Sequence, residues 1–235
     1  MGQTQEYLVK TSRSSCTVQI NLQADSDDMP LYVVGYDPLN ANTLYFRSRF
    51  YINGKETITL NCPQSPITLH LVIWTEDNYS FRSCSVQLLP LSVPEIADPE
   101  ILFIERFARR AGRLRKGIYS ADNVEFKIHL LGAIYTDTGA IHPTPARIHT
   151  ELPIIQVSKI KFDQMTIPER VIILLHEVAH NYINLNPDNE GEADDHAKEI
   201  YNTIGYPQIE SVNAFADIMP DTDGNYERMQ NLVNL

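Results

Sequence analysis

The sequence predicts a two-domain protein, with an all-β antiparallel sandwich at residues 1–92 and an α+β domain at residues 93–235. Three observations support this. The chain has 235 residues, enough for more than one small domain. Short β-rich runs fill the first half, whereas apolar residues at helical spacing dominate the second. A proline-rich connector at residues 90–99 separates the halves, because proline fixes φ and removes a backbone donor.

The first half contains several short β-rich runs. Residues 16–22 alternate apolar and polar side chains, which is typical of a half-buried strand. Asn53-Gly54 favours a type I′ turn, so we expect Tyr51 and Thr57 to flank a hairpin. Together these runs indicate a small sandwich or barrel. The further expected strands are residues 31–36, 43–52, 57–60, 67–74 and 81–89.

The second half is expected to combine a small sheet with helices. Residues 99–116 place Ile104, Phe107 and neighbouring apolar residues on one helical face. Residues 124–133 and 154–157 have strand composition and are joined by a long loop or hairpin connection at residues 135–153. Further helices are expected at residues 167–185, 190–203, 207–218 and 223–233.

The net charge of −11 argues against general nucleic-acid binding, which needs basic surface to displace phosphate counterions. Six of the 19 basic residues lie between Arg106 and Lys116, which leaves a balance of −17 elsewhere. This basic cluster is either a solvated face or a docking surface for acidic neighbours, for other copies of the chain, or for nucleic acid. No apolar run is long enough to span a membrane, and the N-terminal residues lack signal-peptide features, so we expect no secretion.

The three cysteines are an odd number and lie far apart in the sequence. This pattern favours buried free thiols in a reducing compartment, with a single disulfide as the alternative. The three residues are Cys16, Cys62 and Cys84.

Residues 176–180 carry the motif H-E-x-x-H. Thr166 and Glu169 precede it with the T-x-x-E pattern of a helix capping box. One helical turn separates His176 from His180, so both imidazoles face the same side and can reach one tetrahedral metal ion. Glu177 lies beside that face and can reach a metal-bound water without binding the metal. The motif predicts a Zn2+ site with Glu177 as the catalytic base.

A third ligand is expected from the acidic segment that follows. Glu190 and Asp194 fit E-x-x-A-D, in which the first carboxylate binds the metal and the second holds a ligand histidine by its free N–H. A tight helical hairpin centred near Pro187 would instead bring Glu192 or His196 level with the metal. The motif favours Glu190 as the third ligand. The alternatives are Glu192, His196 and Asp194. The same acids would also suit a solvated helix N-terminus.

These motifs resemble those of the gluzincin class of zinc metallopeptidases. The longer stretch at residues 172–210, with Gly-Tyr-Pro near its end, is similar to metallopeptidase-like proteins of Bacteroidota bacteriophages, including crAss-like phages. The resemblance covers about a sixth of the chain, and His196 stands where that group is expected to have Asn. It implies a zincin-like fold for residues 93–235 and Zn2+ held by His176, His180 and Glu190.

The resemblance also implies a function, since a β-sandwich joined to a peptidase-like domain suits a virion protein. We expect a virion-associated zinc metallopeptidase-like protein that hydrolyses peptide bonds if active. The alternative is a structural tail or collar-ring subunit with an idle or purely structural metal site. The implied partners are other virion proteins, further copies in a ring and a peptide substrate, but no membrane. The expected location is the bacterial host cytoplasm and then the virion.

Under the enzyme hypothesis, the substrate would add to an edge strand at residues 154–158. The oxyanion donor stays open between Tyr182, Tyr206 and His142.

Overall fold

The computed structural model describes residues 2–149, 152–182 and 189–218. The chain groups into two compact units, which are described separately. The first comprises Met1–Pro94 with Gly205–Glu210, and the second comprises Glu95–Ile204 with the chain after Glu210. The helix α5 (Gln208–Ile218) therefore begins in one unit and continues in the other. The domain boundary after residue 92 stays a prediction.

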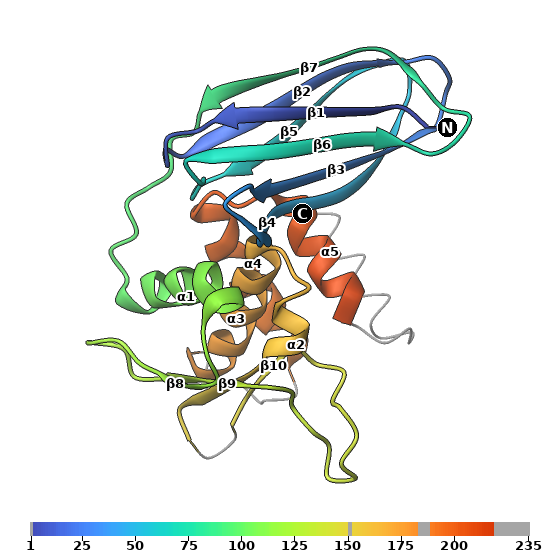
Figure 1. Cartoon of the computed structure of the whole chain (residues 1–235). Coiled ribbons are helices and arrows are strands. Elements are labelled where there is room, and N and C mark those ends of the chain that lie inside the picture. The colour runs from blue at the N-terminus through green and yellow to red at the C-terminus, as the bar shows by residue number, and fades with distance from the viewer. Residues whose placement is uncertain (1, 150–151, 183–188, 219–235) are drawn as a thin grey trace. The chain divides into compact units, whose positions relative to one another are not determined.

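The first unit consists of two antiparallel sheets (Figure 1). The strand orders are β1-β6-β3-β4 and β5-β2-β7. The predicted antiparallel β structure of this half is thereby confirmed. The strands are β1 (Thr4–Lys10), β2 (Cys16–Ala24), β3 (Met29–Asp37), β4 (Asn40–Ile52), β5 (Lys55–Cys62), β6 (Thr68–Thr75) and β7 (Phe81–Pro90).

The alternation of side chains along the strands explains which residues form the core of the first unit. Successive side chains point to opposite faces, and in β2 every second residue, including Val18 and Ile20, is buried. The strand β1 was not expected from the sequence. None of its residues is buried and Leu8 is 69% exposed, so it shows no alternating pattern of buried apolar residues.

The turn at Asn53-Gly54 differs from the predicted hairpin. Gly54 has a φ of +66°, but Asn53 does not have a positive φ, so the turn is not type I′. The strand β4 pairs with β3, whereas β5 pairs with β2, so the chain crosses between the two sheets here. The prediction that Tyr51 and Thr57 flank a hairpin is wrong, because a turn sequence does not specify which strands pair.

The three cysteines of the first unit are free thiols. Cys16 and Cys62 are buried and lie opposite each other in the β2–β5 pair, while Cys84 is only half-buried. The expectation of burial therefore fails for Cys84, which lies in β7 among residues that alternate between half-buried and exposed.

The second unit contains a four-stranded sheet of order β10-β11-β9-β8. The strands β9 and β11 are parallel, and the other neighbours are antiparallel. The strand at residues 154–158 is therefore central, and the prediction that it is an edge is wrong. The edge strands are β10 and β8, and β10 lies within the predicted connection. The bounds are β8 (Gly117–Tyr119), β9 (Lys127–Leu131), β10 (Ala146–Ile148) and β11 (Ile154–Ser158).

The remaining helices are α1 (Pro99–Arg110), α2 (Lys159–Phe162), α3 (Ile167–Tyr182) and α4 (Glu190–Thr203). The helix α1 is shorter than predicted and continues as a 3-10 turn at Ala111–Arg113, where Gly112 disfavours an α-helix. The helix expected at residues 223–233 lies outside the described residues. Within the described chain, no helix is both long and apolar enough to cross a membrane.

The start of α3 is fixed by the predicted capping box. The Thr166 hydroxyl accepts a hydrogen bond from the Glu169 N–H at 3.2 Å, and the Glu169 carboxylate accepts one from the Thr166 N–H at 2.6 Å. Both residues are buried. Two backbone donors at the helix start are thus satisfied, which sets where α3 begins and therefore which way its later residues face.

Arg170 ties α3 to two other helices. Its side chain is fully buried, and it donates to the Phe162 carbonyl at 2.7 Å and to the Ala108 carbonyl at 3.1 Å. These carbonyls lie in the last turns of α2 and α1, where carbonyls lack α-helical partners. The Phe162 carbonyl also accepts from the Met165 N–H at 3.2 Å. Burial lowers the pKa of Arg170 to about 10, which still leaves it charged at neutral pH.

Replacing Arg170 by methionine should destabilise the second unit. Methionine fills space but donates no hydrogen bond, so the Ala108 and Phe162 carbonyls lose the guanidinium, and the Phe162 carbonyl keeps only the Met165 N–H at 3.2 Å. We expect the free energy of unfolding to fall by about 2–4 kcal/mol in urea titrations. The control Arg106→Met removes an exposed arginine from α1 and should change it by less than about 0.5 kcal/mol. Equal effects of the two variants would contradict the role of Arg170.

Candidate metal centre

The two histidines of the H-E-x-x-H motif face α4, which lies beside α3 (Figure 1). His176 and His180 are one turn apart on α3, and their Nε2 atoms are 3.2 Å apart. The His176 ring also packs edge-on against the Phe215 ring of α5, with a centroid separation of 6.0 Å. The histidine pair is therefore held between helices.

Glu190, the first residue of α4, completes a group of three ligands. Its carboxylate oxygens lie 3.2 Å from His176 Nε2 and 3.8 Å from His180 Nε2. The three ligand atoms all lie within 4.8 Å of one another. A tetrahedral ion with nitrogen and oxygen ligands at 2.0–2.1 Å places its ligand atoms about 3.3 Å apart. This group of His176, His180 and Glu190 could hold a metal ion.

Asp194 lies one turn after Glu190 and contacts the far side of the His176 ring. Its Oδ1 is 2.8 Å from His176 Nδ1. Burial by itself would lower the pKa of His176, but the contacts with Asp194 and Glu190 outweigh it and raise that pKa to about 9. Metal binding at neutral pH would therefore displace a proton from this imidazole.

The other candidates for the third ligand lie apart from this group. Glu192 is exposed, and its N–H donates to the Asn189 side chain that caps α4. His196 is half-buried and is not among the three grouped ligands. The described residues thus place Glu190 beside the histidines, while the assignment of the metal-binding residue itself stays a prediction.

Glu177 lies near the histidine pair and contacts the edge strand β10. It is 8% exposed, and its Oε2 accepts a hydrogen bond from the Ile148 N–H of β10 at 2.7 Å. Burial raises the pKa of Glu177, while the charge of His176 and the Ile148 N–H counteract the rise. The contact with Ile148 was not predictable from the sequence, because any residue except proline supplies a backbone N–H.

Two of the suggested oxyanion donors, His142 and Tyr206, are not part of the ligand group in the described structure. His142 is half-buried, and its Nδ1 accepts from the Thr144 N–H at 3.2 Å. Tyr206 is buried and belongs to the first unit. The side chain of Tyr182 lies outside the described residues.

The charges around the histidines favour a bound cation. Glu177, Glu190 and Asp194 place three carboxylates about two imidazoles, and Glu177 and Asp194 are buried. A buried carboxylate is costly unless a cation or several donors compensate it. A divalent ion held by the three grouped ligands would supply that charge, so the residues fit a metal.

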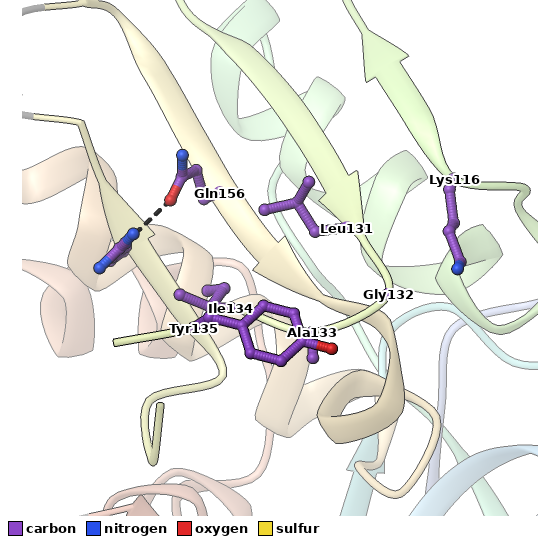
Figure 2. A pocket seen from close by; sticks show the side chains of 8 residues that line it. Lys116, Leu131, Gly132, Ala133, Ile134, Tyr135 and Gln156 are labelled. Atoms are coloured by element: carbon purple, nitrogen blue, oxygen red, sulfur yellow. Dashed lines mark hydrogen bonds between the residues drawn. The ribbon is translucent and has the colours of Figure 1, made fainter. Parts of the chain in front are cut away.

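A separate hollow of about 430 Å³ lies on the sheet of the second unit, on the face opposite its buried side chains (Figure 2). The register places Arg147, Gln156 and Leu131 on the face opposite buried Ala146 and Val157. Arg147 Nε donates to Gln156 Oε1 at 2.8 Å. The hollow is therefore distinct from the metal centre. Its lining residues are Lys116, Leu131, Gly132, Ala133, Ile134, Tyr135, Arg147 and Gln156.

Comparisons with protein-family models, with curated proteins and with solved structures find no match to this chain.

Alanine substitutions should rank the ligands. We expect His176→Ala to abolish tight zinc binding, and Glu190→Ala to weaken it more than Glu192→Ala or His196→Ala. Asp194→Ala removes only a group that orients His176 and should weaken binding about 10- to 100-fold. Competition with a chromophoric chelator measures each affinity. A larger loss in His196→Ala than in Glu190→Ala would contradict the grouping.

Proposed function

We propose that the protein is a zinc-dependent metallopeptidase of the gluzincin type, with a zincin-like second unit. The observation that carries this proposal is the spacing of the ligand atoms of His176, His180 and Glu190, at 3.2–3.8 Å. That spacing suits a tetrahedral ion. The resemblance of the H-E-x-x-H and E-x-x-A-D motifs to those of gluzincins supports the same ligand set.

Hydrolysis is the reaction that the neighbouring groups favour. Two imidazoles and one carboxylate suit zinc in hydrolases and also Fe(II) in oxygenases. Glu177 favours the first, because a carboxylate beside the ligands can act as a general base, which hydrolysis requires. Zinc held by these residues supplies Lewis-acid chemistry, which activates water toward a carbonyl carbon.

Two side chains prepare the site for this reaction. Glu177 is the group that accepts a proton from the reacting water. Burial raises the pKa of its carboxyl group. Asp194 contacts Nδ1 of His176 and so leaves Nε2 to face the other ligands. Both acids are buried, which limits competition from bulk water.

An extended peptide is the substrate class that fits the sheet. The strand β10 is an edge, and its residue Ile148 contacts Glu177. A peptide that adds to this edge as a further strand would pass the base, with main-chain hydrogen bonds supplying affinity. The proposed binding strand is therefore β10 in place of the strand at residues 154–158.

Glu177→Gln tests the proposed base. Glutamine keeps the size of the side chain and leaves His176, His180 and Glu190 in place, so zinc content should be unchanged. Hydrolysis of a denatured protein substrate should fall by about 100- to 10,000-fold, the usual contribution of a general base. Equal rates in both proteins would contradict the role of Glu177, and zinc-loaded wild type without activity would contradict the peptidase proposal.

A structural role in a phage tail or collar ring is the second candidate function. The observation that favours it is the exposed basic cluster of residues 106–116. Arg106, Arg110 and Arg115 are exposed and form no ion pair with any residue in the described part of the chain. Isolated surface pairs contribute about 0–1 kcal/mol each, whereas a cluster facing an acidic neighbour adds several such terms and fixes register.

Charge reversal tests this second function. The variant with Arg106, Arg110 and Arg115 changed to Glu leaves the buried face of α1 at Ile104 and Phe107 intact. The monomer should therefore fold, while assembly into oligomers or particles should be lost. High salt should weaken assembly of the wild type, because exposed charges are screened.

The matched control reverses three exposed basic residues outside the cluster, Lys10, Arg13 and Lys55. It makes the same change in net charge and should assemble normally, as light scattering or sedimentation would show. Normal assembly of the cluster variant would assign the cluster to a solvated face and remove the support for a structural role.

A further inference from the structure

One backbone group of β10 reaches the metal centre. The ladder between β10 and β11 continues at its two ends, where His149 N–H donates to the Ile154 carbonyl and Ser158 N–H to the Pro145 carbonyl, both at 2.8 Å. Successive residues of an antiparallel strand alternate between facing the partner strand and facing away. The N–H of Ile148 therefore points out of the free edge of the sheet and does not serve the ladder.

This outward N–H is bound by Glu177. The distance from Ile148 N to Glu177 Oε2 is 2.7 Å, and Glu177 is 8% exposed. A glutamate side chain has three rotatable bonds, so a carboxylate that receives no directional contact can take several positions. A donor on the backbone of a paired strand has no such freedom. The N–H thus fixes one carboxylate oxygen and leaves Oε1 free.

The structure assigns Ile148 as a positioning residue, whose backbone N–H aims the Glu177 carboxylate at the reacting water. This inference rests on the proposed function, because aiming matters to rate only if Glu177 is the base. The side chain of residue 148 is not involved. Among the natural residues, only proline would remove the donor.

Ile148→Pro is a clean removal of this donor. Proline is tolerated on edge strands where the N–H faces away from the ladder. Misplacing a catalytic group by about 1 Å can cost about 100-fold in rate, so we expect kcat to fall about 10- to 100-fold while KM changes little. Zinc affinity should be unchanged, because no ligand is altered. Ile148→Val keeps the N–H and should lose less activity than Ile148→Pro.

Amide hydrogen exchange in the full chain tests the contact without any measurement of activity. Glu177→Ala removes the acceptor and should speed exchange at Ile148 by about tenfold, whereas Glu177→Gln keeps an acceptor oxygen and should retain protection. The His149 amide is an internal control, because its partner is the Ile154 carbonyl of the ladder. Its exchange should be the same in all three proteins.

The outcomes separate this inference from the proposed function. Unchanged exchange at Ile148 in Glu177→Ala would overturn the contact, and full kcat in Ile148→Pro would overturn the positioning role. If Ile148→Pro fails to fold, the exchange rates alone decide. A wild type that binds zinc but cleaves no peptide would overturn the proposed function. The contact between Ile148 and Glu177 could then still be detected by hydrogen exchange, but it would have no role in catalysis.

Discussion

The second unit depends on one buried cation. Arg170 is fully buried, and its guanidinium bonds the carbonyls of Ala108 and Phe162. A buried charge is normally costly, but the last carbonyls of a helix carry partial negative charge, and two helices direct such carbonyls at Arg170. The helix α3 is thereby anchored to α1 and α2 less than two turns before His176. Its rotation about its own axis follows from that anchor and from the capping box.

The geometry of the metal centre follows from this fixed rotation. His176 and His180 share one face and meet α4, where Glu190 and Asp194 are also one turn apart. A helix turns about 100° per residue, so Glu177 cannot face the same way as His176. It meets the free edge of the sheet instead, where Ile148 provides an N–H. The proposed metal ligand and the proposed base thus come from neighbouring residues because the helix separates their directions.

The features that were predictable from the sequence are local ones. The capping box at Thr166 and Glu169 and the bounds of α4 follow from short-range spacing, and the structure confirms both. Pairing between distant segments was not predictable. Nothing in the composition of residues 154–158 shows that strands lie on both sides of it, and Asn53-Gly54 does not reveal that its flanking strands join different sheets. The sequence did not decide between the candidates for the third ligand, because spacing does not show whether a side chain at the start of a helix reaches the two histidines.

Zinc K-edge X-ray absorption of the zinc-loaded full chain tests the proposed metal centre most directly, because it identifies the atoms around the ion. Binding by His176, His180 and Glu190 predicts only nitrogen and oxygen neighbours at about 2.0–2.2 Å, with the outer-shell pattern of two imidazoles. A sulfur neighbour at about 2.3 Å would place the ion at a cysteine such as Cys16 or Cys62. That result, or a failure to take up zinc, would contradict the proposed centre.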